Sequence, residues 1–192
     1  MNAQELLSQI KASEERNSRE DIWAEYLKNA PQSSTFTEFG VYNGKSINHM
    51  SSIRPDCHFH GFDSFDGLPE NWTKKFQKGH FKTDIGTLTF NKNVKIYVGM
   101  FSDTIQNAVE LPHIYGVHID CDLGSSTTFV LDALSKNIIN SKSYILFDEL
   151  YNYKGYERHE FKSLLEWSNK ENVNFEVLAH NALSQQVLIK IK

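Results

Sequence analysis

The chain has 192 residues, of which 40% are hydrophobic and 23% are charged, and its formal net charge is −4. This length suits one domain around a single core, and the charge provides no broad basic surface, so we expect no nucleic-acid partner. No apolar run approaches the roughly 20 residues that span a bilayer, and residues 1–5 lack the basic and apolar regions of a secretory signal, so we expect no membrane partner and a cytoplasmic location.

Residues 1–30 are predicted to form an N-terminal helical segment. Apolar side chains recur at three-to-four-residue spacing between residues 3 and 29, with a break near Asn17 and a stop before Pro31. This spacing predicts one or two amphipathic helices that pack onto the rest of a single domain over residues 1–192.

After residue 34, short runs rich in β-branched and aromatic residues alternate with helical patterns. The predicted strands cover residues 35–39, 58–62, 94–98, 116–119, 144–147, 175–179 and 186–191, and the predicted helices lie near residues 45–52, 103–109, 127–139 and 158–170. This alternation predicts an α/β fold with a mostly parallel seven-stranded sheet and helices on both faces. The last two strands are too close in sequence for a crossover helix between them, which predicts an antiparallel C-terminal hairpin.

The two cysteines lie in different parts of the predicted sheet. Cys57 precedes the second predicted strand, and Cys121 follows the fourth. These positions are at opposite ends of a parallel sheet, so we expect two reduced thiols rather than a disulfide.

The segment 66–93 is long and carries several lysines, with glycines and a proline between them. Long insertions at the carboxyl end of a strand often act as lids over a ligand. An ordinary crossover helix with a solvated basic face explains the composition as well. Both interpretations stay open at the level of the sequence.

A turn with two glycines follows the first predicted strand, and a carboxylate ends the second. Gly40 and Gly44 allow the backbone to approach a ligand closely, and Asp63 is placed to accept hydrogen bonds from a ribose diol. The glycine spacing differs from the G-x-G-x-x-G pattern that cradles a dinucleotide pyrophosphate. The pattern therefore predicts a nucleoside with a non-phosphate tail, such as S-adenosylmethionine.

Acidic residues follow the fourth and fifth predicted strands. Asp120 and Asp122 come after 116–119, and Asp148 and Glu149 come after 144–147. Three such carboxylates that converge on one point suit Mg²⁺ or another hard divalent cation, which would lower the pKa of a substrate hydroxyl. Carboxylates at strand ends also cap helices, so a metal site and a capping role both stay open.

The histidines offer a rival acid–base group. His118 lies within a predicted buried strand, where a core role is favoured, whereas His159 lies in a more polar stretch that can face the mouth of a pocket. A histidine base needs only hydrogen-bond reach to its proton. His159 is therefore the candidate base of a metal-independent mechanism.

Five sequence blocks, in this order, together resemble the macrocin O-methyltransferase family of class I S-adenosylmethionine-dependent enzymes. They are EFGVYNGKS at 38–46, GFDSFDGLP at 61–69, GMFSDT at 99–104, HIDCDL at 118–123 and FDE at 147–149. The resemblance extends over about residues 35 to 165. It implies a Rossmann-like methyltransferase fold and the transfer of a methyl group to a hydroxyl, notably of a sugar or a sugar-containing natural product.

The resemblance also implies roles for individual positions. The residues that would hold S-adenosylmethionine are Glu38, Gly40, Tyr42, Gly44, Ser46, Asp63, Ser64, Phe65, Gly99, Phe101, Ser102 and Asp120, and the residues that would hold Mg²⁺ or another divalent cation are Asp120, Asp148 and Glu149. Asp120, or a hydroxide on the metal, would take the proton of the acceptor, because Leu123 stands where related catechol-type enzymes have a lysine base.

The sequence departs from the family pattern at Gly124, where a tyrosine is expected. Loss of this aromatic side chain predicts a wider pocket or a different acceptor. The sequence identifies neither the acceptor nor the oligomeric state, and a homodimer stays open. Two alternatives to the metal-assisted enzyme also stay open, namely a metal-independent methyltransferase with a histidine or acidic base, and a non-catalytic binding module.

Overall fold

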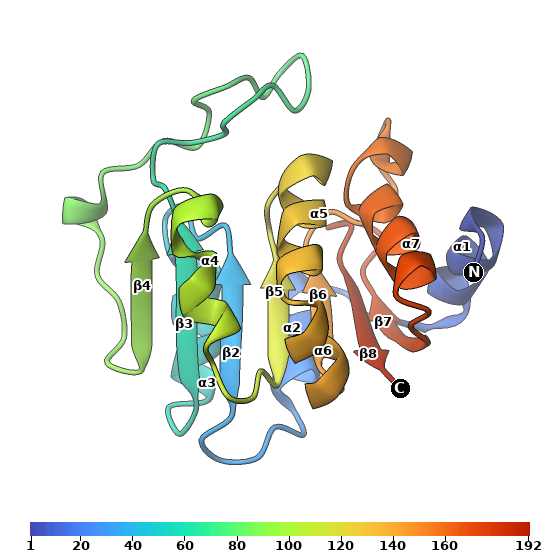
Figure 1. Ribbon diagram of the computed structural model, residues 1–192, viewed down its shortest axis with the longest axis horizontal. Helices are drawn as coiled ribbons and strands as arrows, with labels where there is room; N and C mark the ends of the chain where they lie inside the picture. The colour runs from blue at the N-terminus through green and yellow to red at the C-terminus, as the bar shows by residue number, and fades with distance from the viewer.

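The computed structural model describes residues 1–192, and its centre is an eight-stranded sheet with the order β1-β7-β8-β6-β5-β2-β3-β4 (Figure 1). The strands are β1 (Glu14–Glu15), β2 (Thr35–Phe39), β3 (His58–Asp63), β4 (Val94–Val98), β5 (Gly116–Ile119), β6 (Tyr144–Phe147), β7 (Phe175–His180) and β8 (Val187–Ile191). β2 to β6 are mutually parallel, and β8 runs antiparallel to both β6 and β7. The predicted parallel sheet and C-terminal hairpin are therefore confirmed.

All seven predicted strands are present, and their ends differ from the prediction by at most one residue. The eighth strand, β1, is an addition that the sequence analysis did not predict. Its two residues, Glu14 and Glu15, are exposed and pair in parallel with Ala179 and His180 of β7. Two glutamates carry neither the alternation nor the β-branched side chains that mark a strand, so this strand depends on its pairing with β7.

Seven α-helices surround the sheet, namely α1 (Ala3–Ala12), α2 (Arg19–Leu27), α3 (Lys45–Ile53), α4 (Phe101–Val109), α5 (Gly124–Ala133), α6 (Ser135–Ser141) and α7 (Glu160–Lys170). The helix predicted near residues 127–139 begins earlier and is divided into α5 and α6 at the fully buried Leu134. The two N-terminal helices break where the sequence predicted. None of the helices is both long enough and apolar enough to cross a membrane.

Two apolar clusters hold the helices to opposite faces of the sheet. One cluster packs helices α1, α4, α5, α6 and α7 against strand residues such as Val117 and Ile145. The other packs α2 and α3 against strand residues such as Phe36 and Leu146. Every residue of β5 and β6 is buried, because helices cover both faces of these central strands. The parallel pairing of β2 with β5 and of β5 with β6 places their carboxyl ends side by side, where a ligand site is expected in an open α/β sheet.

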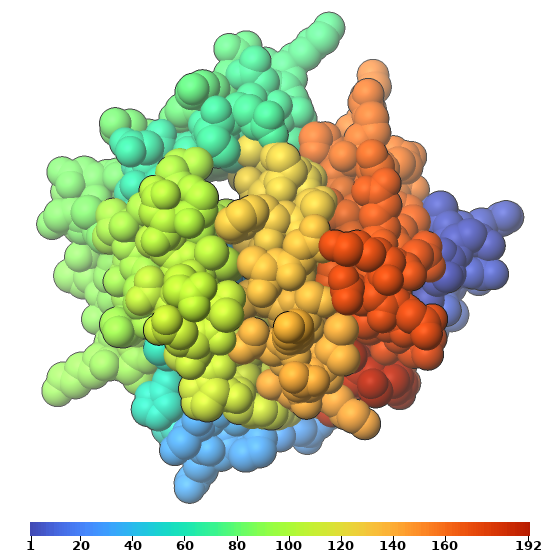
Figure 2. Space-filling view, in the orientation of Figure 1, coloured from blue at the N-terminus to red at the C-terminus, as the bar shows by residue number.

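The segment 66–93 contains no α-helix, only a short 3₁₀ turn at Ile85–Thr87. The crossover helix that the sequence left open is therefore absent. The segment runs over the carboxyl ends of the strands, in teal and green at the top of Figures 1 and 2. Backbone hydrogen bonds fold it onto itself: Leu68 N–H donates to His80 at 2.8 Å and Gly79 N–H donates to Leu68 at 2.8 Å. Its closure over a ligand stays a prediction.

The two cysteines are buried and free. Cys57 lies just before β3, and Cys121 lies just after β5, near the opposite end of the sheet. The prediction of two unpaired thiols is confirmed, and burial raises the pKa of both.

Candidate active site

A cavity of about 510 Å³ opens at the carboxyl ends of the parallel strands, beneath the segment 66–93. Its volume lies within the range of small-molecule sites. The predicted cofactor residues that line it are Gly40, Tyr42, Ser46, Asp63, Ser64, Gly99, Phe101 and Asp120, and all three predicted metal ligands, Asp120, Asp148 and Glu149, line it as well. Residues that lie far apart in the sequence are thus brought together at one place.

Four predicted cofactor residues lie outside the cavity wall. Glu38 is buried behind Ser46, whose hydroxyl donates to Glu38 Oε1 at 2.8 Å. Phe65 packs in the core, Gly44 precedes α3, and Ser102 lies on the exposed side of α4. These four residues can support the site from behind or from its margin.

The turn after β2 is packed directly against the chain after β5. Gly40 has a φ of 96°, and a Cβ at this position would overlap the carbonyl oxygen of Asp120. Only glycine meets both requirements, because it tolerates a positive φ and has no side chain. This contact places the glycine turn next to the first residue of the acidic group.

Asp63 shapes the same turn through its carboxylate. Oδ2 accepts the backbone N–H groups of Val41 at 2.7 Å and Tyr42 at 2.8 Å, and Oδ1 accepts the N–H of Phe65 at 2.7 Å. A carboxylate has about four lone-pair sites. Asp63 therefore organises the cavity wall in addition to its predicted role toward a ribose, a role that stays a prediction.

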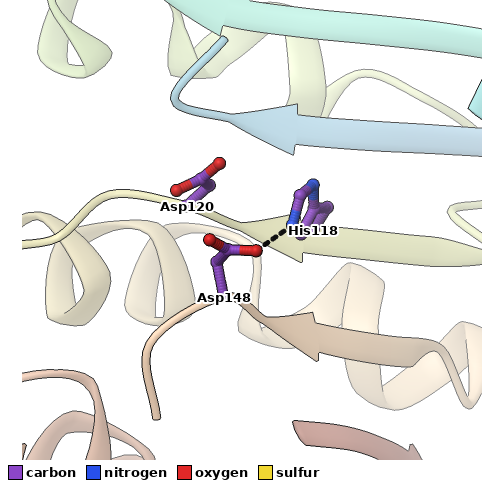
Figure 3. A group of neighbouring side chains, drawn as sticks. All are labelled: His118, Asp120 and Asp148. Atoms are coloured by element: carbon purple, nitrogen blue, oxygen red, sulfur yellow. Dashed lines mark ion pairs between the residues drawn. The ribbon is translucent and has the colours of Figure 1, made fainter. Parts of the chain in front are cut away.

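A buried imidazole connects the glycine turn to the acidic group. His118 Nδ1 lies 2.9 Å from Glu38 Oε2, and His118 Nε2 lies 3.7 Å from Asp148 Oδ1 (Figure 3). Burial lowers the pKa of His118, but the nearby carboxylates of Asp148 and Glu38 outweigh it and raise the pKa to about 10. This direction favours the protonated ring at neutral pH. The predicted core role of His118 fits its complete burial.

The carboxyl groups converge at the floor of the cavity in two overlapping sets. Oxygens of Asp120, Asp122 and Glu149 lie within 4.8 Å of one another, and so do ligand atoms of His118, Asp120 and Asp148. Figure 3 shows Asp120 and Asp148 at the carboxyl ends of β5 and β6. Asp120 belongs to both sets, whereas the other two predicted ligands, Asp148 and Glu149, fall in different sets. Asp122 joins Asp120 and Glu149, although the resemblance did not assign it to the metal.

Burial, and next the charge of Asp148, raise the pKa of Asp122 to about 7. The same two causes raise the pKa of three further carboxyl groups well above their usual range, those of Asp120, Glu149 and Glu160. Glu149 Oε2 and Glu160 Oε1 are buried without a hydrogen-bond partner. The floor of the cavity therefore holds more carboxyl groups than the neighbouring cationic side chains balance, and it is suited to bind a cation.

His159, the predicted alternative base, does not line the cavity. Its ring packs at the edge of Trp72, with centroids 6.3 Å apart, and Trp72 is the residue that faces the cavity. Burial, and then the charge of Arg158, lower the pKa of His159. This placement favours a supporting role for His159 behind the cavity wall.

Gly124 does not widen the pocket, and that expectation is wrong. A Cβ at Gly124 would lie 3.0 Å from the Cα of His159 and 3.1 Å from the carbonyl oxygen of Arg158. The space that a larger side chain would take is filled by the backbone of this neighbouring segment. The glycine allows the start of α5 to pack closely against it.

Several residues of the cavity wall were not predicted from the sequence. Arg19 reaches the acidic group from the start of α2, and Trp72, Phe76 and Phe81 form an aromatic wall contributed by the segment 66–93. The rings of Trp72 and Phe76 stack with their centroids 5.3 Å apart. The ring centroids of Phe81 and Tyr42 are also 5.3 Å apart. No spacing marks these residues, although aromatic side chains in a polar loop are a signal for a binding surface.

Comparisons with known proteins agree on the architecture. The calicheamicin methyltransferase CalS11 superposes with a TM-score of 0.67 over 89% of this chain and 76% of its own, at 18% identity. The O-methyltransferase TomG of Streptomyces achromogenes, solved with S-adenosylmethionine, gives a TM-score of 0.56 over 91% and 79%, at 11% identity.

The chain has the methyltransferase fold. The Rossmann-like fold predicted from the sequence is therefore confirmed. A third structure with this fold, cmcI with magnesium and S-adenosylmethionine, gives a TM-score of 0.57 over 92% of this chain and 72% of its own, at 14% identity. No family model matches the sequence, and no curated protein matches it. Membership of the macrocin O-methyltransferase family stays a prediction.

Proposed function

We propose that the protein is an S-adenosylmethionine-dependent O-methyltransferase that acts on a hydroxyl of a small molecule, a sugar or a sugar-containing natural product. The observation that carries this proposal is the contact of Gly40 with Asp120, which joins the glycine turn and the acidic floor in one cavity. Support for the acceptor class comes from CalS11, which is described as a TDP-rhamnose 3'-O-methyltransferase.

The donor would lie along the wall made by the glycine turn and the start of α4. Asp63 and Ser46 offer polar groups there, and Phe101 offers an apolar surface for the adenine. Glu38 would act from behind by holding Ser46. In this arrangement the donor's methyl group would face the acidic floor.

The acidic floor fits a divalent cation such as Mg²⁺. Asp120, Asp122 and Glu149 offer oxygens within 4.8 Å of one another, and Glu149 Oε2 is buried with no partner in the protein. Oxygen donors of this kind suit hard cations. When bound, the cation would lower the pKa of the acceptor hydroxyl.

The side chains of the cavity would mainly hold the two reactants in line. In the reaction, the C–S bond of the sulfonium breaks as a C–O bond forms to the acceptor oxygen, and the hydroxyl proton passes to a carboxylate of the floor. Asp120 is our candidate for this base, because it lies both at the glycine turn and in the acidic group. Holding the reactants in this geometry turns a bimolecular displacement into an effectively unimolecular one.

The test is methyl transfer from labelled S-adenosylmethionine to a panel of nucleotide sugars, glycosides and phenols, with Mg²⁺ and with excess chelator. We expect turnover of a sugar hydroxyl that falls on chelation and that Asp120→Asn abolishes. Asp132→Asn is the matched control, because Asp132 is exposed on α5 and pairs with Lys170 away from the cavity. Turnover that persists in chelator would reject the metal assistance, and turnover of phenols alone would reject the sugar acceptor.

A further inference from the structure

Arg19 places a permanent positive charge at the acidic floor of the cavity. It is the first residue of α2, which Ser18 caps by accepting the N–H of Asp21 at 3.1 Å. Its guanidinium Nη2 bonds to Asp148 Oδ2 and lies 3.5 Å from Glu149 Oε1. The side chain is 40% exposed, so it reaches the floor from the open side of the cavity.

Asp148 is already surrounded by donors. Arg19 bonds to Oδ2, the side-chain amide of Gln186 donates to Oδ1, and His118 Nε2 lies 3.7 Å from Oδ1. A divalent cation at Asp148 would lie beside the guanidinium of Arg19. Asp148 is therefore the least available of the predicted metal ligands.

The other acids of the floor are more available. Asp120 and Asp122 contribute oxygens close to Glu149, and the buried Oε2 of Glu149 has no partner. Glu149 belongs both to the ion pair with Arg19 and to the group of acids that could bind a cation. Its Oε1 faces Arg19, whereas its Oε2 has no partner. A cation bound by these three acids would lie next to the guanidinium.

We propose that Arg19 is the resident counter-ion of the acidic floor, and that a divalent cation binds Asp120, Asp122 and Glu149 in competition with its guanidinium. This inference rests on the metal site of the proposed function. It assigns Asp148 to the ion network with Arg19 and His118, and it makes Arg19 the residue that sets the affinity of the site for metal.

The experiment measures the dissociation constant of Mn²⁺ by electron paramagnetic resonance, with the full chain and without methyl donor. Arg19→Gln should bind Mn²⁺ about tenfold more tightly than the wild type, because it removes a like charge from a partly exposed site. Arg16→Gln is the matched control, since Arg16 pairs with Glu14 and Glu25 at 2.8 Å outside the cavity. This control should leave the constant unchanged.

A second measurement uses the wild type alone and does not depend on the folding of a variant. Mn²⁺ should increase the rate at which phenylglyoxal modifies Arg19, followed by peptide mass spectrometry, and should leave the rate at Arg16 unchanged. Equal dissociation constants for wild type and Arg19→Gln, or no change in the modification of Arg19 at saturating Mn²⁺, would overturn the competition alone. No Mn²⁺ binding by either protein would overturn the metal site and the competition with it.

Discussion

Gly40 packs so closely against Asp120 that a Cβ at Gly40 would overlap the carbonyl oxygen of Asp120. The glycine turn and the acidic floor, which the sequence presents 80 residues apart, are therefore one unit in the fold. A substitution at this contact should therefore disturb the glycine turn and the acidic floor together.

Gly40→Ala should lower the free energy of unfolding by about 2 kcal/mol or more, because it adds a steric overlap to a positive φ. It should also weaken the binding of S-adenosylhomocysteine. The measurements are urea unfolding and calorimetric titration. Gly79→Ala is the matched control, since Gly79 has a φ of 82° but nothing within 4 Å of its Cβ position. It should cost about 1 kcal/mol. Equal losses for the two variants would contradict the close contact.

Asp63→Asn should lower the free energy of unfolding by about 1 to 3 kcal/mol, because one of its acceptor oxygens becomes an amide donor that faces a backbone N–H. Val41, Tyr42 and Phe65 all donate to this carboxylate. Urea unfolding measures the loss. The control Asp66→Asn changes an exposed carboxylate that pairs with an exposed lysine, and its stability should match the wild type. An unaltered midpoint in Asp63→Asn would refute this role in the turn.

His118 should stay protonated on both ring nitrogens through neutral pH, because the nearby carboxylates of Asp148 and Glu38 raise its pKa to about 10. A pKa above the unfolded value near 6.5 stabilises the fold fully below that pH, and the stabilisation is lost as the pH rises through about 10. Imidazole ¹⁵N chemical shifts measure the state of the ring in the metal-free protein. Glu38→Gln should lower the pKa of His118, and a neutral ring in the wild type at pH 7 would disprove the ion network.

Trp72→Ala should raise the KM for the acceptor by about tenfold, because it removes a large apolar face from the cavity wall. The dissociation constant of S-adenosylhomocysteine should not change, since the donor is proposed to lie along the glycine turn and the start of α4, which do not include Trp72. Lys74→Ala is the control in the same segment, because Lys74 is exposed and does not line the cavity. An unchanged KM, or an equal loss of donor affinity, would show that the aromatic wall does not contact the acceptor.

The parts of the fold and site that have a local sequence signal were predictable. β6 is a continuous apolar run, β5 is interrupted only by His118, and the acids after them follow directly from the ends of these strands. Their convergence follows from the parallel sheet, so Asp120 and Asp148 could be placed together without a structure.

The missing parts depend on contacts between distant segments. Arg19 and Asp148 are 129 residues apart, and nothing near Arg19 in the sequence indicates that its helix turns it toward the cavity. Gly124 was read as an opening in the pocket, but a backbone segment from residues 158–159 fills that space. Such packing depends on the tertiary structure, which local patterns do not record.

Calorimetric titration with S-adenosylhomocysteine measures whether the cavity binds a methyl donor. We expect saturable binding of one molecule per chain, weakened by Asp63→Asn and unaffected by Asp66→Asn. Absence of binding to the folded wild-type chain, or equal binding by the two variants, would contradict the assignment of this cavity to the donor.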